Sequence, residues 1–239
     1  MTKQSELIPY VFDNQPHLLS RTLKQWMDTS SRFTLFVDDN RDKIRKKVRV
    51  TRQPESLLDL LGELEVAYCL LNDRRLEVAY EPYASAKRRG PDFAVSYRTN
   101  LVFNIEVARM RVEESGTIGS DLQRKEVRIL RILLDKLGQM QPGMPNLLVI
   151  QLQEDLAPSI DLGRVMHEVK SRVESKDPSF FATSRYSSPA AFYKDFLHLG
   201  GILLWSSGAQ LWVNKQARPS LEGKVLRLVR SLIPAAATR

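Results

Sequence analysis

The sequence contains few of the residues on which zinc sites and disulfide-stabilised domains depend. Cys69 is its only cysteine, which excludes a disulfide within the chain and any zinc site built from cysteines. The three histidines, at positions 17, 167 and 198, are scattered and have no acid or cysteine at ligand spacing. A glycine-rich phosphate loop is also missing, because Gly200-Gly201 leads into a strand pattern with no helix after it.

Long apolar stretches are absent as well. No run reaches the roughly 18 apolar residues that a membrane-spanning helix needs, so we expect no contact with a membrane. The first six residues carry no apolar segment behind Lys3, so we expect no secretory signal and a cytoplasmic protein. The hydrophobic share of 43% and the charged share of 27% are typical of globular proteins, and we expect a single domain over 1–239.

Positive charge is in excess and unevenly placed. The net charge is +8, and such a balance favours polyanions, because lysine and arginine release counterions condensed on phosphates. A basic stretch at 41–52 holds a single acid, Asp42. It is either a solvated helix face or a surface that contacts nucleic acid, DNA in the first instance. The residues that we predict to contact the phosphate backbone are Arg45, Lys46, Lys47, Arg49, Lys87, Arg88 and Arg89.

Hydrophobic periodicity predicts a mixed α/β protein. The segment 33–37 fits a strand or a helix entry equally well. The predicted helices are 17–30, 41–49, 54–71, 119–137, 160–173, 188–198 and 219–232, and the predicted strands are 75–81, 91–97, 101–108, 146–152, 202–205 and 210–213. Short connections favour an antiparallel meander for the first three strands, and the helix at 119–137 favours a crossover to the fourth. We therefore divide the chain into N-terminal helices (1–53), an αβββαβ core (54–152) and a C-terminal elaboration (153–239).

Two acidic residues are the strongest candidates for chemistry. Side chains alternate along a strand, so Asp92 and Glu106 can project to the same side of neighbouring strands. Two carboxylates and a backbone carbonyl, such as that of Val107, make a hard oxygen site that suits Mg²⁺ or Mn²⁺. On the helix 54–71, a spacing of about 100° per residue places Glu63 at the margin of the apolar stripe and Glu65 in solvent.

These residues resemble the PD-(D/E)XK superfamily of restriction-endonuclease-like nucleases. The resemblance rests on Glu63 in a helix, Gly90-Pro91-Asp92-Phe93 opening one strand, and the segment from Phe103 to Ala108 on the next. It covers about residues 55–152. It implies phosphodiester hydrolysis with one or two divalent metals, Asp92 and Glu106 as metal ligands, and Glu63 as an accessory ligand or water-orienting acid.

The sequence departs from the family pattern at one position. The family has a lysine two residues after the second acid, where this chain has Ala108. We expect Lys125 to point outward from the helix 119–137, whose buried stripe we place at Val127, Leu130, Leu134 and Leu137. Gln123 falls on that stripe and resembles a glutamine that some branches of the superfamily place beside the metals. Lys87 is a further candidate for the missing charge.

Each candidate also has a reading without catalysis. Asp92 follows Gly-Pro and fits a turn, Glu106 fits an ion pair with Arg88 or Arg111, and Glu63 and Gln123 fit ordinary helix positions. The sequence thus leaves three hypotheses: a metal-dependent nuclease, a nuclease-fold module that has lost catalysis and binds nucleic acid or a protein, and an unrelated mixed α/β protein. A homodimer is left open.

Overall fold

The computed structural model describes residues 4–51, 53–84, 90–98, 101–111, 121–152, 160–206, 209–221 and 223–232. The fold is mixed α/β, as predicted, with a six-stranded sheet whose strands follow one another in chain order. Contacts between Cα atoms divide the chain into two compact units, Met1–Tyr80 with Ser96–Asn100, and Glu81–Val95 with Leu101–Arg239. No helix in the described part of the chain is long and apolar enough to cross a membrane.

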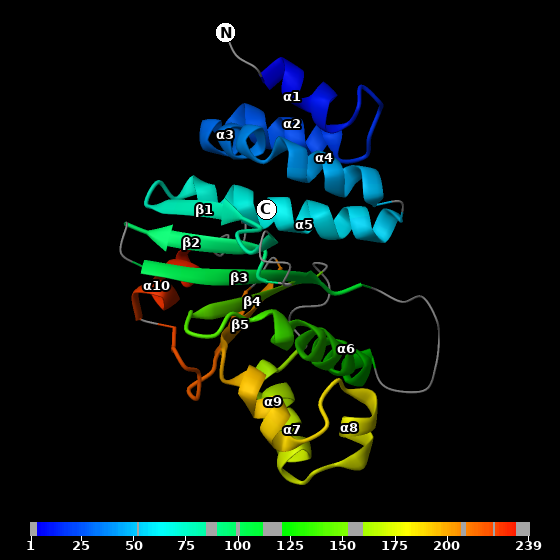
Figure 1. Ribbon diagram of the computed structural model, residues 1–239, viewed down its shortest axis with the longest axis vertical. Helices are drawn as coiled ribbons and strands as arrows, with labels where there is room; N and C mark the ends of the chain where they lie inside the picture. The colour runs from blue at the N-terminus through cyan, green and yellow to red at the C-terminus, as the bar shows by residue number, and fades with distance from the viewer. Residues whose placement is uncertain are drawn as a thin grey trace. The chain divides into compact units, whose positions relative to one another are not determined.

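The first unit is mostly helical. Its elements are α1 (Gln4–Val11), α2 (Ser20–Thr29), α3 (Ser31–Asp39), α4 (Arg41–Val50), α5 (Pro54–Asn72) and strand β1 (Leu76–Tyr80) (Figure 1). The undecided segment 33–37 is helical, because the Ser30 side chain accepts a hydrogen bond from the Phe33 amide and caps α3. Phe33 is fully buried and packs edge-on against Trp26 and Tyr68, which anchors α3 against α2 and α5.

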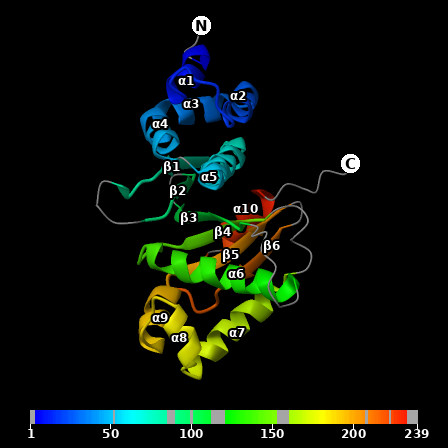
Figure 2. The ribbon, with the colours of Figure 1, turned by 90° about the vertical axis from the view of Figure 1, so that its right-hand side faces the viewer.

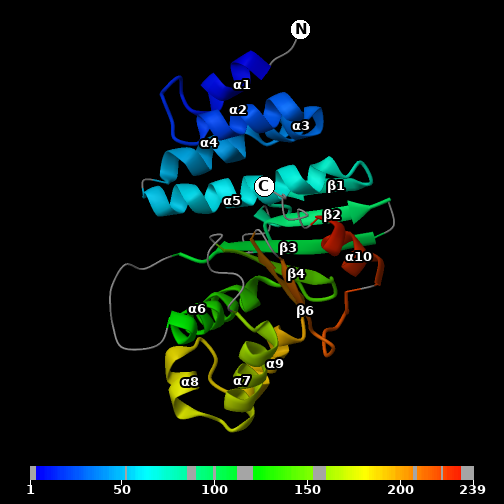
Figure 3. The same ribbon diagram turned by 180° about the vertical axis from the view of Figure 1, so that it is seen from behind.

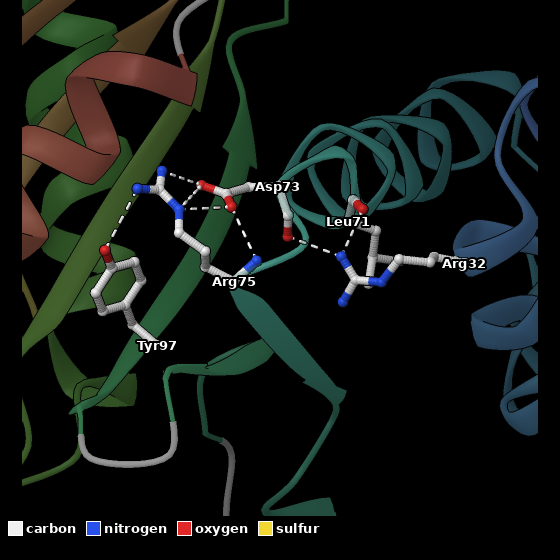
Figure 4. A network of polar contacts seen from close by, with 5 residues as sticks. All are labelled: Arg32, Leu71, Asp73, Arg75 and Tyr97. Carbon is white, nitrogen blue, oxygen red and sulfur yellow. Dashed lines mark hydrogen bonds and ion pairs between the residues drawn. The ribbon is translucent and has the colours of Figure 1, made fainter.

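A polar network fixes the end of α5 (Figure 4). The Arg32 guanidinium donates to the backbone carbonyls of Leu71 at 2.8 Å and Asp73 at 2.7 Å, and also to that of Leu76. The Asp73 carboxylate pairs with Arg75 at 2.6 Å, and this side-chain hydrogen bond lowers the pKa of Asp73. Arg32 thus bonds to one carbonyl in the last turn of α5 and to two that follow the helix, and it fixes where the chain turns from α5 into β1.

The second unit holds most of the sheet. Its elements are β2 (Phe93–Tyr97, of which 93–95 belong to this unit), β3 (Leu101–Arg109), α6 (Asp121–Lys136), η2 (Leu137–Gln139), β4 (Asn146–Gln151), α7 (Leu162–Glu174), α8 (Pro178–Thr183), α9 (Pro189–Phe196), β5 (Leu199–Trp205), β6 (Gln210–Val213) and α10 (Gly223–Leu232). Strands β3, β4 and β5 are parallel, and β6 is antiparallel to β5. The crossover expected between β3 and β4 is confirmed, and β4 is buried along its whole length, as its apolar sequence predicts.

Helices cover both faces of this part of the sheet (Figures 1 and 3). On one face, residues of α6, α7 and α9 form an apolar core with alternate residues of β4 and β5, among them Leu148 and Ile202. On the other face, α10 buries Val225, Leu228 and Val229. Gly200 permits this packing, since a Cβ at this position would lie 2.7 Å from Cγ of Leu221, the residue that leads into α10. Figure 2 shows α6 and α10 on different sides of these strands.

The sequence prediction was wrong in several local details. It missed the short helices α1 and α8. In the helix 119–137 it correctly placed Leu134 and Leu137 in the core but assigned two other residues to the wrong face. Val127, assigned to the buried stripe, is 46% exposed, whereas Lys125, expected to point outward, is only 7% exposed. Apolar residues surround more than half of α6, so the sequence pattern did not define which side packs on the sheet. Glu65, expected in solvent, is partly buried.

Candidate functional site

Asp92 and Glu106 lie where the strands β2 and β3 position them. Asp92 directly precedes β2, and its Oδ2 accepts a hydrogen bond of 2.8 Å from the Val107 amide. Glu106 lies within β3 and is 1% exposed. Its register partner on β4 is Leu148, a member of the core beneath α6, so the Glu106 side chain faces α6. The expected alternation of faces along β3 is therefore confirmed.

A lysine from α6 provides positive charge at this site. Lys136, the last residue of α6, places its Nζ 2.5 Å from Oε1 of Glu106. Burial alone would lower the pKa of Lys136, but the charge and hydrogen bond of Glu106, together with the carboxylates of Asp92 and Asp135, raise this pKa above its usual value. Lys136 is thus held in its charged form near both candidate ligands. Lys136 is thus a partner of Glu106 that the sequence did not predict, and Arg88, one of the two expected partners, lies outside the described residues.

A pocket opens beside these side chains within the second unit. It has a volume of about 370 Å³ and is lined by Glu81, Tyr83, Ala84, Gly90, Pro91, Asp92, Asp135, Lys136 and Gln139. Three carboxylates and one ammonium group on this lining make the pocket polar, and they suit it to a cation or to a phosphate that is bound through a cation. Gly90 is required at its place, since a Cβ there would lie 2.7 Å from the Cβ of Tyr83.

A buried network of amide side chains supports one wall of the pocket. The Tyr83 hydroxyl donates to Oδ1 of Asn104 at 3.1 Å, and Nδ2 of Asn104 donates to Oδ1 of Asn146 at 3.0 Å. Both asparagines are fully buried, and Nδ2 of Asn146 donates in turn to three backbone carbonyls, those of Gln141, Met144 and His198. Because a buried amide without partners is costly, this network fixes Tyr83 and the start of β3.

The space facing Ala108 is apolar. Ala108 packs against the core formed by α6, α7 and α9, and its register partner on β4 is Ile150, a member of that core. A lysine two residues after Glu106 would therefore have to place its charge among aliphatic side chains. The positive charge near Glu106 comes from the end of α6 instead.

Glu63 and Val107, two other predicted site residues, make contacts that differ from their predicted roles at a metal site. Glu63 belongs to the first unit, where its Oε2 accepts hydrogen bonds from Lys47 and from the Tyr80 hydroxyl, both at 2.6 Å. Its side chain is 17% exposed, and these contacts give it a structural role within that unit. Val107 contributes its amide N–H to Asp92, whereas the sequence analysis expected its carbonyl oxygen to be a metal ligand.

The basic helix α4 is largely neutralised by acids of the same unit. Arg45 and Arg49 both pair with Asp13, at 2.5 and 2.7 Å, and their hydrogen bonds hold the pKa of Asp13 well below its usual range. Lys47 pairs with Glu63. Lys46 is exposed and has no hydrogen bond or ion pair with the described residues. Of the four residues of α4 predicted to contact phosphate, three are thus engaged in ion pairs.

Several candidates cannot be placed. Lys87, Arg88 and Arg89 lie outside the described residues, and so does the side chain of Gln123, although position 123 is part of α6.

The donor set fits a divalent ion that keeps much of its water. No three Asp, Glu, His or Cys side chains among the described residues are grouped so as to hold a metal ion. Mg²⁺, however, is commonly bound through one or two carboxylates and several water molecules. Asp92 lines the pocket, Glu106 is linked to it through Lys136, and a carboxylate that accepts one hydrogen bond has further lone pairs. The residues that would hold Mg²⁺ or Mn²⁺ are therefore Asp92 and Glu106.

Comparisons of the chain with models of protein families, with curated proteins and with solved structures find no match.

Proposed function

We propose that this protein is a metal-dependent nuclease of the PD-(D/E)XK type, with Asp92 and Glu106 as metal ligands and Lys136 in place of the motif lysine. The observation that supports this proposal is the contact between Lys136 and Glu106 beside the pocket that Asp92 lines. In the family pattern a lysine stands near the second acid. Here the ammonium group reaches the same acid from α6. A cytoplasmic location and DNA as the substrate remain predictions.

Each residue of the site has a definable task in this reaction. A bound Mg²⁺ or Mn²⁺ would supply Lewis acidity toward the phosphate and lower the pKa of a bound water. Lys136, held charged, would stabilise the negative charge that develops on the phosphate. The Val107 amide orients the Asp92 carboxylate, and the amide network behind Tyr83 keeps the pocket wall in place.

A cleavage assay tests the proposal. Purified protein is incubated with Mg²⁺ or Mn²⁺ and with double-stranded DNA, single-stranded DNA or RNA, and products are resolved by electrophoresis. Asp92→Asn keeps an oxygen that can accept from the Val107 amide but removes the charge, and we expect at least a hundredfold loss of cleavage rate. Glu168→Gln, which removes an exposed carboxylate of α7 outside the pocket, is the control and should stay within a few-fold of wild type. Cleavage by Asp92→Asn at the wild-type rate, or none by wild type, would refute catalysis.

One observation favours a second candidate, a module that has kept the fold and lost catalysis. Lys136 already supplies a positive charge to Glu106, and an ammonium group at that place can substitute for a metal instead of assisting one. Titration with Mn²⁺ in a calorimeter discriminates between the two. If wild type binds no Mn²⁺ and cleaves nothing, yet still binds nucleic acid, the second candidate replaces the first.

A further inference from the structure

Helix α10 carries an exposed row of cations that contrasts with the neutralised helix α4. Lys224, Arg227 and Arg230 are exposed, whereas Val225, Leu228 and Val229 are buried. At about 100° and 1.5 Å per residue, the three cations span an arc of about 120° and about 9 Å along the side opposite the buried valines and leucine. We name these three residues the α10 ridge. Figure 3 shows α10 at the surface of the second unit, on the side away from α6.

The charges of the α10 ridge have no counter-charge among the residues that the structure describes. None of the three side chains has a hydrogen bond or ion pair with the residues that the structure describes. The sequence gives a reason, since Glu222 is the only acidic residue after Asp195, and it lies outside the described residues. By contrast, Asp13 and Glu63 engage three of the cations of α4.

We propose that the α10 ridge binds the phosphate backbone of a nucleic acid. Cations at successive turns of one helix match a ligand with charges repeated at short intervals, and arginine suits phosphate because its guanidinium can donate two parallel hydrogen bonds. The contact would be independent of base sequence, because phosphates carry no sequence information. This inference rests on the proposed substrate class but not on catalysis.

Two other polyanionic partners fit the ridge less well. An amphipathic helix binds a membrane surface by inserting its apolar face, but Val225, Leu228 and Val229 are at most 4% exposed and already pack inside the protein. An acidic protein would bury an apolar centre within its interface. Among the described residues of 209–232, no large hydrophobic side chain is classed as exposed.

The test compares two triple variants that remove the same charge. One is Lys224→Gln/Arg227→Gln/Arg230→Gln. The matched control is Arg21→Gln/Arg131→Gln/Lys194→Gln, whose three exposed cations lie on α2, α6 and α9. Circular dichroism first establishes that both are folded. Fluorescence anisotropy then measures the binding of a labelled DNA duplex, single-stranded DNA and RNA at several salt concentrations, without divalent metal.

We expect the ridge variant to bind the preferred nucleic acid about tenfold to several hundredfold more weakly at roughly 0.1 M salt, and the control to change much less. The slope of log affinity against log salt should become shallower by about 2 to 3 for the ridge variant, since each lost phosphate contact removes nearly one unit. An equal loss in both variants would show that only net charge matters and would overturn the inference, as would an unchanged slope or no binding by wild type.

Binding of phosphatidylserine vesicles that depends on the ridge, without such binding of nucleic acid, would assign it to a membrane instead. If ridge-dependent binding persists while no metal supports cleavage, the proposed catalysis fails and the inference stands.

Discussion

The ion pair between Lys136 and Glu106 makes a sharp prediction about stability. Glu106 is 1% exposed, and the Lys136 side chain is 23% exposed. Removing one partner of a buried pair commonly costs 3–5 kcal/mol, because it leaves an uncompensated charge. The ammonium of Lys136 is partly open to water, so we expect Lys136→Met to reduce the free energy of unfolding by about 2–3 kcal/mol. Methionine keeps an unbranched apolar stem, so most of this loss reflects the charge.

A double-mutant cycle isolates the pair. Glu106→Gln removes the buried charge and leaves an amide oxygen for Lys136, so we expect a smaller loss of about 1–2 kcal/mol. In Lys136→Met/Glu106→Gln neither charge of the pair remains. The loss of unfolding free energy in this double variant should therefore be smaller than the sum of the two single losses by about 1–2 kcal/mol. Lys194→Met, an exposed lysine of α9, is the control and should change stability by at most about 0.5 kcal/mol.

The measurement is urea denaturation at pH 7, followed by circular dichroism and by tryptophan fluorescence. Because the chain has two compact units, the free energy is assigned only where both probes report the same transition. The reasoning is refuted if Lys136→Met is no less stable than Lys194→Met. It is equally refuted if the loss of unfolding free energy in the double variant equals the sum of the losses in the two single variants, since Glu106 and Lys136 would then not interact.

Three further predictions concern other parts of the molecule. Arg32→Lys loses the planar guanidinium that donates to three carbonyls between the last turn of α5 and the start of β1, and urea denaturation should show a free energy of unfolding lower by about 1–3 kcal/mol. Arg49 and Arg45 lower the pKa of Asp13, so the stability that this carboxylate contributes is complete above its unfolded value of 3.8 and is lost as the pH falls below it. The difference in urea midpoint between wild type and Asp13→Asn should therefore shrink below about pH 4, and a constant difference would contradict this. Ala108→Lys, which restores the family motif, should cost at least about 2 kcal/mol and not increase cleavage, because the new charge enters an apolar core.

Much of the fold could be predicted because the pattern of apolar residues is strong where burial is complete. Strand β4 is apolar at its four central positions, Leu147 to Ile150, and is buried on both faces, and the crossover follows from the long helical segment before it. The short helices α1 and α8 were missed, since six to eight residues hold too few turns for periodicity to be visible. In α6 the apolar residues are so numerous that several choices of buried face fit equally well.

The candidate site was predicted in part, for a similar reason. Alternation along β3 predicted that Glu106 and Ala108 share one side of the strand, and the structure adds that this side faces α6. Lys136 was not predicted, because it lies 30 residues after Glu106, whereas the family pattern has its lysine two residues after the second acid. A helix that connects parallel strands runs antiparallel to them, so its last turn returns toward the start of those strands. The rule points to the end of the helix, where Lys136 reaches Glu106, and Glu106 is level with Leu148, the third residue of β4.

The two basic helices show why the density of cations in a sequence is a poor guide to where a polyanion binds. The dense run of cations in α4 predicts a phosphate-binding surface. The same unit, however, contains Asp13, Asp38 and Glu63, which form ion pairs with four of the side chains of α4. The cations of α10 are fewer and are spaced three residues apart, with almost no acid in the last forty or so residues of the sequence. An ion pair within the protein offsets the charge that a phosphate would meet. Whether a cation can bind a polyanion therefore depends on how many acidic side chains lie close to it. By this measure, neutralising the three cations of α10 should weaken polyanion binding more than neutralising Arg45, Lys47 and Arg49, and the same anisotropy titration can compare the two triple variants directly.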